Sequence, residues 1–208
     1  MDREQLGRLF DEFEQPGPKD NDETRLSWPM IVTATRPIIE NEQIDPVDRF
    51  VLAINTFLPP RRSDIWNLNR EGSRNRLDLE SGDLSIQDYK TCRKYGPFEV
   101  CLFRPGIFWG EAEADRFREI CSKIERVPFK CSSMQSYAGK VAAIFSRYIG
   151  SRCSILDLRR AFDAHVRQYL SNPRIAREQR ERIKDVLALY TAHSSTMSEF
   201  YADKVDLS

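Results

Sequence analysis

The sequence has no long hydrophobic run and no leader segment of a recognisable kind. Of its 208 residues, 40% are apolar and 31% are charged, and no uninterrupted apolar stretch approaches the roughly 20 residues of a transmembrane helix. The amino-terminal stretch MDREQLGRLFDEFEQ is charged and mildly amphipathic, which is typical neither of a secretory signal nor of an acid-poor transit peptide. We therefore predict a soluble, intracellular protein with no membrane contact and one substantial core.

Histidine and cysteine are scarce, and nothing in their spacing indicates a metal site. The two histidines stand apart from the five cysteines, which form no CxxC pair, and the chain has neither a P-loop nor a cluster of acidic metal ligands. The cysteines are Cys92, Cys101, Cys121, Cys131 and Cys153. We expect them to be reduced thiols, and we expect a function that uses no metal and no cofactor.

The chain also lacks net charge, but its charges are unevenly distributed. Residues 1–25 carry eight acidic and four basic side chains, whereas residues 140–192 carry eleven basic and five acidic ones. A neutral total argues against a nucleic-acid partner, because phosphate binding normally requires a basic excess. The basic second half leaves two interpretations open, a solvated helix face or a surface for phosphates.

Proline, glycine and capping residues divide the chain into segments. Residues 15–22, QPGPKDND, are typical of a linker, so we predict an acidic tail or linker over residues 1–25 and one globular domain over residues 26–208. Ser27 and Asp45, each with a proline in the turn that follows, predict the starts of two helices. Pro59 and Pro60 predict the end of the second helix.

The periodicity of apolar residues then changes twice. Short alternating runs between Asn75 and Phe103 predict an antiparallel meander of about three strands, interrupted at SGD and CRKYG. Helical spacing returns in three stripes: Phe117, Ile120, Cys121 and Ile124; Leu158, Phe162, Val166 and Tyr169; Ile183, Val186, Leu187 and Tyr190. The predicted fold class is therefore α+β, mostly helical, with a small three-stranded antiparallel sheet.

Four short segments combine basic, imidazole and phenol side chains. They are PPRRSDIWNL with Arg61 and Arg62, DYKTCRK with Lys90 and Lys94, LDLRRAFDAH with Arg159 and Arg160, and AHSSTMSEFY with His193 and Tyr201. Each segment taken alone has an ordinary structural explanation, such as a surface arginine or a turn lysine. His165 and Tyr190 match none of the motifs, and we expect them to be structural.

In this order and spacing, the four segments resemble the motifs of the tyrosine recombinase catalytic domain, the phage-integrase family. The matching residues are Arg61, Ser63 and Asp64 in the first motif, Lys90 as the hairpin lysine, Leu156 to Arg159 in the second motif, His193 to Ser195 in the third, and Tyr201 as the nucleophile. The resemblance covers residues 26–208. It implies a tyrosine-recombinase-like catalytic domain that breaks and rejoins double-stranded DNA.

The chemistry of this family suits the residue types in the four segments. Two guanidinium groups, Arg61 and Arg159, match the growing charge on a phosphodiester, and Tyr201 would form a covalent 3′-phosphotyrosine. Lys90 would protonate the leaving 5′ oxygen, and His193 would hydrogen-bond the phosphate or move a proton. The expected DNA contacts beyond these are Arg62, Lys94 and Arg160.

Two departures from the family pattern keep alternatives open. Leu156 stands where the second motif usually has histidine, and Arg160 is a candidate for the missing donor. Tyr201 follows His193 by eight residues, one fewer than the usual spacing. The alternatives are a catalytically weakened, recombinase-derived DNA-binding protein and a type IB-like topoisomerase.

The resemblance also suggests how the protein assembles. Family members usually clamp DNA with a separate amino-terminal helical domain, whereas only some 25 residues precede the predicted core here. The sequence is then either a fragment or one whose partner supplies the clamp. We expect a DNA-associated protein that is a monomer off DNA and an oligomer on it.

Overall fold

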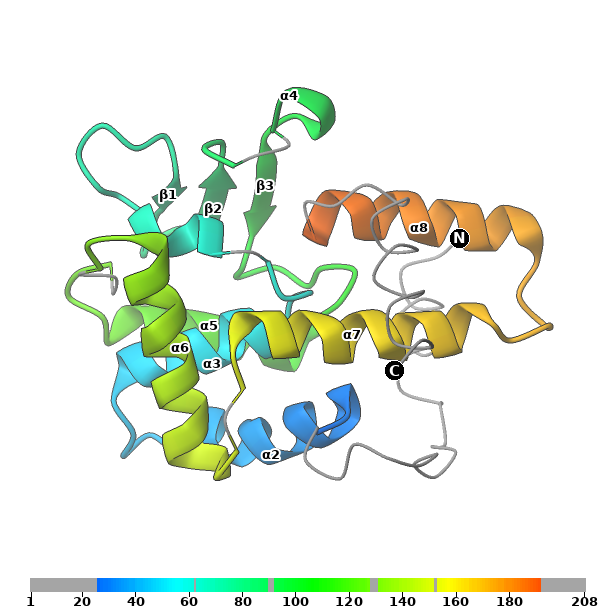
Figure 1. Cartoon of the computed structure of the whole chain (residues 1–208). Helices are drawn as coiled ribbons and strands as arrows, with labels where there is room; N and C mark the ends of the chain where they lie inside the picture. Colours follow the sequence, from blue (N-terminus) through cyan, green and yellow to red (C-terminus); the bar gives the residue numbers. More distant parts are fainter. Residues whose placement is uncertain (1–25, 62, 90–91, 128–130, 152, 192–208) are drawn as a thin grey trace.

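Helices predominate in the protein, and a small sheet lies beside them. The computed structural model describes residues 26–61, 63–89, 92–127, 131–151 and 153–191 (Figure 1). The elements in chain order are α2 (Trp28–Glu40), α3 (Pro46–Thr56), the 3-10 helix η1 (Ser63–Asn67), β1 (Arg76–Leu77), β2 (Asp83–Ile86), α4 (Cys92–Tyr95), β3 (Phe98–Cys101), α5 (Glu111–Ser122), α6 (Met134–Ile149), α7 (Ile155–Leu170) and α8 (Arg177–Thr191). The prediction of a mostly helical α+β fold is confirmed.

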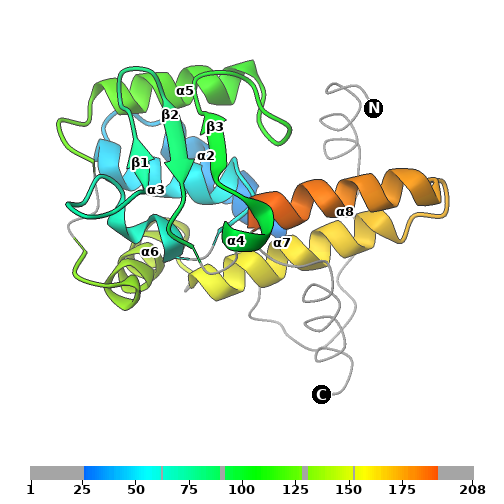
Figure 2. The same cartoon turned by 90° about the horizontal axis from the view of Figure 1, so that it is seen from above.

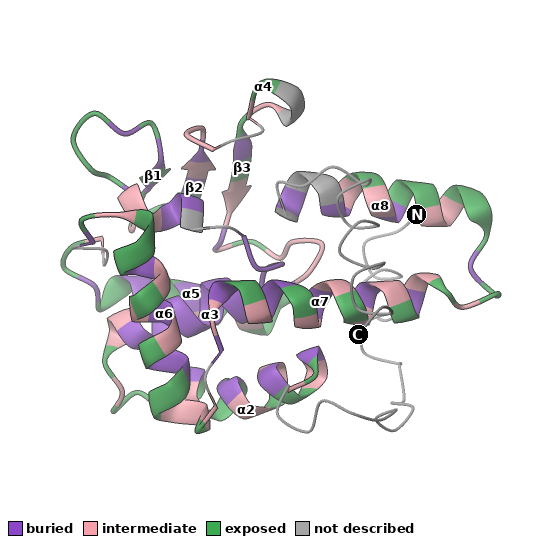
Figure 3. Cartoon of the chain, viewed as in Figure 1, coloured by how far each residue is buried: buried purple, intermediate pink, exposed green. Residues whose placement is uncertain are grey.

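The central helix is α3, which packs against α2, α5 and α6. It begins at Asp45, whose side chain accepts hydrogen bonds from the backbone N–H groups of Val47 (2.8 Å) and Asp48 (3.2 Å). Every residue from Asp48 to Thr56 is buried, as expected of a helix with neighbours on all sides (Figure 3). Burial continues without interruption to Arg61, so the first motif starts inside the protein.

The sheet has the predicted antiparallel order β1-β2-β3. Leu84 pairs with Val100 and Ile86 pairs with Phe98, which places the buried Leu84 and Ile86 on one face of β2. The strands are shorter than the alternating runs suggested. The expected interruption at CRKYG contains a short helix, because Cys92 to Tyr95 form α4 within the β2–β3 connection.

The predicted helical stripes of the second half lie on α5, α7 and α8 (Figure 2), except that Ile124 follows the end of α5. Ser154 caps α7 in a reciprocal capping box with Asp157. Helices α7 and α8 lie side by side in both views and extend away from the sheet. A second apolar cluster joins them to α2, where Trp28 meets Phe162 edge to face with ring centroids 5.1 Å apart.

None of the helices in the described ranges combines the length and the apolar character needed to cross a bilayer.

The turn before β2 depends on a glycine, which gives a first prediction. Gly82 is buried at φ +76°, and a Cβ there would lie 2.5 Å from the ring of Phe103. We expect Gly82→Ala to lower the free energy of unfolding by about 2 kcal/mol or more in urea denaturation. Gly72 is the matched control, because it has the same φ but nothing within 4 Å of the point that a Cβ would occupy. Equal losses in Gly82→Ala and Gly72→Ala would show that the contact with Phe103 contributes nothing.

Candidate functional site

Arg61 lies at a junction of the sheet with α8. Arg61 directly follows the two prolines after α3, and the residue is only 6% exposed. Its guanidinium lies over the ring of Phe98, 4.2 Å from the centroid, and over that of Tyr89 at 5.0 Å. Its Nη1 donates a hydrogen bond to the carbonyl of Tyr190 at 2.9 Å. One side chain therefore connects β3, the β2–β3 connection and the end of α8.

Arg159 reaches the same place from α7. It is the fifth residue of that helix and is 7% exposed. Its Nη1 lies 3.5 Å from the carbonyl oxygen of Pro60, at the outer limit for a hydrogen bond. Since Pro60 directly precedes Arg61, the side chain of Arg159 reaches the backbone of the segment that carries Arg61. We call Arg61, Arg159, Tyr89, Phe98 and Tyr190 the arginine cluster.

In this cluster, burial and neighbouring charges shift the pKa values in opposite directions. Burial lowers the pKa of Arg61, whereas the charge of Asp64 and the phenol of Tyr89 favour the charged guanidinium. Burial raises the pKa of Tyr89, which the charge of Arg61 opposes. Burial also raises the pKa of Asp163, one turn beyond Arg159, whose charge opposes that change. Since arginine stays protonated in proteins, the cluster concentrates positive charge where little water screens it.

The exposed residues of the second motif lie on another side of α7. Leu156, which takes the place of the family's histidine, is 46% exposed, and Arg160 is exposed one turn further on. Residues four apart on a helix are neighbours on its surface. Arg160 is therefore placed to bring a donor to the position that Leu156 leaves apolar.

Several residues singled out from the sequence lie outside the described residues, namely Arg62, Lys90, His193 and Tyr201. Ser63 opens η1 and Lys94 lies in α4, but the side chains of these two are not described either. The chain still constrains where these segments start. Lys90 directly follows Tyr89, and His193 comes two residues after the end of α8 at Thr191.

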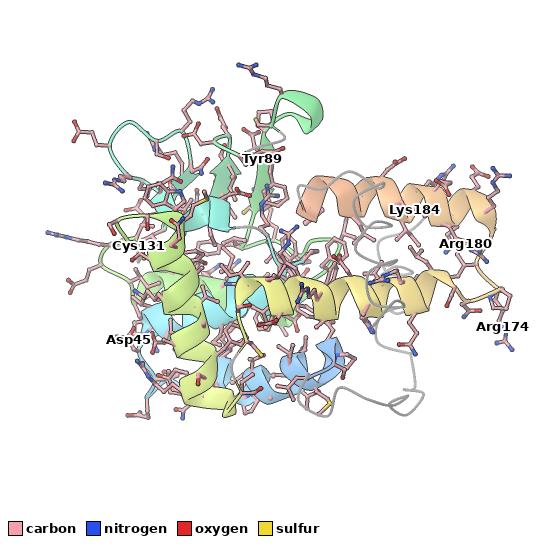
Figure 4. The ribbon with its side chains drawn as sticks, viewed as in Figure 1. Asp45, Tyr89, Cys131, Arg174, Arg180 and Lys184 are labelled. Carbon is pink, nitrogen blue, oxygen red and sulfur yellow. The ribbon has the colours of Figure 1, made fainter. Side chains whose placement is uncertain are left out.

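Tyr89 was not expected in the site, and Tyr190 was expected only as core. Figure 4 labels Tyr89 beside the sheet, next to α4. Its hydroxyl donates to the carbonyl of Gly96, closing the β2–β3 connection around α4. Tyr190 is 7% exposed, with its ring 5.2 Å from that of Phe98, which confirms it as core. The sequence signal for both was weak, an aromatic residue next to a motif.

The basic surplus of the second half is partly structural. Arg174 and Arg180 lie at the free end of the α7–α8 hairpin, and Lys184 lies at the middle of α8 (Figure 4). Arg180 donates to the carbonyls of Ile175 and Asn172, each at 3.0 Å, and so closes the connection between the helices. Lys184 pairs with Glu181 at 3.1 Å. Arg174 is exposed and adds to the positive charge at this end.

No group of three or more His, Cys, Asp or Glu side chains that could hold a metal ion occurs in the described part of the chain. His165 is half-buried on α7, where burial lowers its pKa. The chemistry that the cluster supports best is recognition of an anion by two guanidinium groups.

A scan against protein-family models and searches of curated proteins and of solved structures found no match for this chain.

Proposed function

We propose that this protein cuts and rejoins double-stranded DNA as tyrosine recombinases do, through a 3′-phosphotyrosine formed on Tyr201. The observation that carries the proposal is that Arg61 and Arg159 are both buried and that Nη1 of Arg159 lies 3.5 Å from the carbonyl oxygen of Pro60, the residue before Arg61. These are the two arginines that the motifs assign to the phosphate. A random pair of arginines so far apart in sequence has no reason to share a buried location.

The surroundings of Arg61 add support, because two of its contacts lie next to other motifs. The Tyr89 ring at the guanidinium directly precedes Lys90. The Tyr190 carbonyl that accepts from Arg61 lies three residues before His193. Arg61 therefore contacts the two segments that lead along the chain to Lys90, the proposed acid, and to His193.

The reaction divides among these groups as follows. The phenol of Tyr201 gives its proton to His193 as its oxygen attacks phosphorus, and the bond from phosphorus to the 5′ oxygen breaks. Arg61 and Arg159 stabilise the charge that grows on the non-bridging oxygens in the five-coordinate transition state. Lys90 gives its proton to the leaving 5′ oxygen, and His193 hydrogen-bonds the phosphate. Rejoining reverses these steps, because the phosphotyrosine retains the energy of the original bond.

Phosphate binding requires a local exchange of hydrogen-bond acceptors. The carbonyl of Tyr190 accepts from Arg61 in the structure, so a phosphate oxygen would take the place of that carbonyl. The exchange replaces a neutral acceptor by a charged one, and charge-assisted hydrogen bonds are roughly twice as strong. Arg160, exposed on α7, is positioned for a further contact with the DNA backbone.

A covalent-capture experiment tests the proposal. The protein is incubated with a pool of nicked duplexes of randomised sequence in the presence of a chelator, and DNA that stays attached in denaturing detergent is recovered. We expect an adduct with the wild-type protein and none with Tyr201→Phe, because the phenol oxygen forms the bond. Tyr148→Phe is the control, since the Tyr148 hydroxyl contacts Asp48 at 2.9 Å on another part of the surface. Equal adduct from the wild type and Tyr201→Phe would refute the assignment.

The exposed Leu156 favours a second candidate, a DNA-binding protein with weakened catalysis. That function predicts salt-dependent DNA binding without any adduct, with Arg159→Ala changing only the affinity. A topoisomerase of the type IB kind would instead relax plasmids that share no particular sequence. The same protein preparation distinguishes the three outcomes.

A further inference from the structure

The two ends of the α7–α8 hairpin differ in their surroundings. One end, the base, joins the arginine cluster, because Arg159 is the fifth residue of α7 and the Tyr190 carbonyl that accepts from Arg61 lies in the last turn of α8. The other end, residues 171–180, extends away from the sheet and carries Arg174 (Figures 1, 2 and 4). We call residues 171–180 the hairpin tip. A ligand held at the base reaches the tip only if that ligand is long.

The arginines of this hairpin are paired differently from those on the other long helices. Every arginine on α2, α3, α5 and α6 forms an ion pair with a carboxylate, namely Arg36, Arg49, Arg116, Arg118 and Arg147. By contrast, Arg160, Arg174 and Arg177 are exposed, and none of them forms an ion pair with a carboxylate of the described residues. Their guanidinium donors are therefore available to water or to a ligand.

The acidic residues near the tip do not cancel its positive charge. Residues 174–184 contain five basic and two acidic side chains. Both acidic ones pair with a basic residue further along α8, Glu178 with Arg182 at 2.8 Å and Glu181 with Lys184 at 3.1 Å. The surplus of positive charge is left on Arg174, Arg177 and Arg180. Since Arg180 donates to backbone carbonyls, Arg174 and Arg177 are the two that can bind an anion without losing a contact.

The length of α8 fits a ligand that repeats its negative charge. From Arg177 to Tyr190 the helix rises about 20 Å, at about 1.5 Å per residue. Phosphates follow one another at about 3.4 Å of rise along each strand of duplex DNA, so this length corresponds to about six base pairs. A duplex with one phosphate at the arginine cluster therefore has further phosphates within reach of the tip. The planar fork of arginine matches their geometry.

We infer that the hairpin tip is a second DNA-binding surface, at which Arg174 and Arg177 bind backbone phosphates about six base pairs from the phosphate at the arginine cluster. The inference rests on the proposed function. The contact carries no sequence information, because phosphates are the same at every step of the duplex. Its effect is on affinity and on salt dependence, and the chemistry at the base does not require it.

The test measures how salt weakens the binding of the full chain to duplex DNA. A fluorescently labelled duplex longer than two helical turns is titrated at a series of salt concentrations, and the logarithm of the binding constant is plotted against that of the salt concentration. Each phosphate contact contributes about −0.9 to the slope. We expect the slope of the double variant Arg174→Gln, Arg177→Gln to be shallower than that of wild type by about 1.8, and that of each single variant by about 0.9.

A matched pair of substitutions removes the same charge from the body of the protein. Arg36 and Arg118 are about half exposed on α2 and α5, where each pairs with a carboxylate. The double variant Arg36→Gln, Arg118→Gln should keep a slope within about 0.5 of wild type, because neither residue contacts a phosphate. Circular dichroism confirms that both double variants are folded at the assay temperature.

The outcomes separate the tip from the function beneath it. Equal slopes for wild type and the tip variant, or an equal change in the Arg36 and Arg118 variant, would overturn the tip contact and leave the proposed function intact. Unchanged DNA slopes together with weaker binding of polyglutamate would overturn it in favour of an acidic protein partner. A wild type that binds no duplex DNA at any salt concentration would refute both. A shallower slope in the tip variant, with no covalent adduct from wild type, would support the tip contact and refute strand cleavage alone.

Discussion

Replacing Arg49 by methionine is expected to lower the free energy of unfolding by about 4 kcal/mol, the range for breaking a buried ion pair from one side. Arg49 is 0% exposed on α3. Its Nε donates to the carbonyl of Ile39 at 2.7 Å, and its two terminal nitrogens reach the carboxylate of Glu119 at 3.1 and 2.5 Å. The side chain thereby ties the end of α2 and the middle of α5 to the central helix.

The loss should depend on pH, because Glu119 is part of a larger network. Burial alone would raise the pKa of Glu119, but hydrogen bonds from Arg49, Lys123 and Arg116 outweigh it and lower the pKa from 4.5 to about 2. A carboxylate with a depressed pKa stabilises the fold above about pH 4.5, and that contribution disappears as the pH falls through 2. The difference between wild type and Arg49→Met should therefore shrink at pH 2.5.

Urea denaturation at pH 7 and at pH 2.5 measures both effects. Arg182→Met is the control, because Arg182 is an exposed member of an ion pair on α8 and its loss should change stability by less than about 1 kcal/mol. A loss below about 1 kcal/mol in Arg49→Met, or one that is the same at both pH values, would contradict this account of the network.

The sequence predicted those elements of the fold that depend on residues close together in the chain. Asp45 and the proline after it mark the start of α3 because capping is decided within a few residues. The apolar stripe ending at Tyr190 predicted a helix because one face of α8 is buried. The three strands followed from alternation, though α4 escaped notice because a four-residue helix has no periodicity to detect.

Contacts between distant segments could not be predicted in the same way. Arg49 follows two acidic residues at the start of α3, a local sequence that predicts a solvent-exposed side chain. It is buried instead, and it forms an ion pair with Glu119, seventy positions away. Asn75 looks like an ordinary turn residue, because the four hydrogen-bond partners of its buried side chain come from two separate segments. Helix α6 carried no stripe that was recognised, although its buried residues include Val141 and Phe145.

For the candidate site, the sequence indicated the residues but not that they are buried. The motifs grouped Arg61 with Arg159 through a resemblance, and in the fold Nη1 of Arg159 lies 3.5 Å from the carbonyl oxygen of Pro60, the residue before Arg61. Taken alone, each arginine seemed a surface residue. Both are buried, and Arg61 is covered by Phe98 and Tyr190, which are distant in sequence, so no local pattern predicts its burial.

Substitution of Arg61 is expected to slow formation of the Tyr201 adduct by about 100- to 1,000-fold, the effect of removing one donor to a developing oxyanion. DNA affinity should fall by less than about tenfold, because only one of many phosphate contacts is lost, whereas the additional charge that the guanidinium stabilises grows only in the transition state. Arg61→Met removes the charge. Arg160→Met is the matched control, since the exposed Arg160 is expected to affect binding and its salt dependence but not the rate of cleavage.

Arg61→Lys should fail to rescue the reaction at neutral pH. This result would distinguish a buried cation from one that is exposed to water. Burial lowers the pKa of Arg61, and the same burial would lower that of a lysine, which starts about two units below arginine and offers no planar fork. The lysine would therefore lose its proton as the pH rises and regain it as the pH falls. Single-turnover adduct formation between pH 6 and pH 8 should then show Arg61→Lys gaining on Arg61→Met toward the acid side. A lysine variant as fast as wild type at pH 8 would mean that Arg61 faces water when DNA is bound.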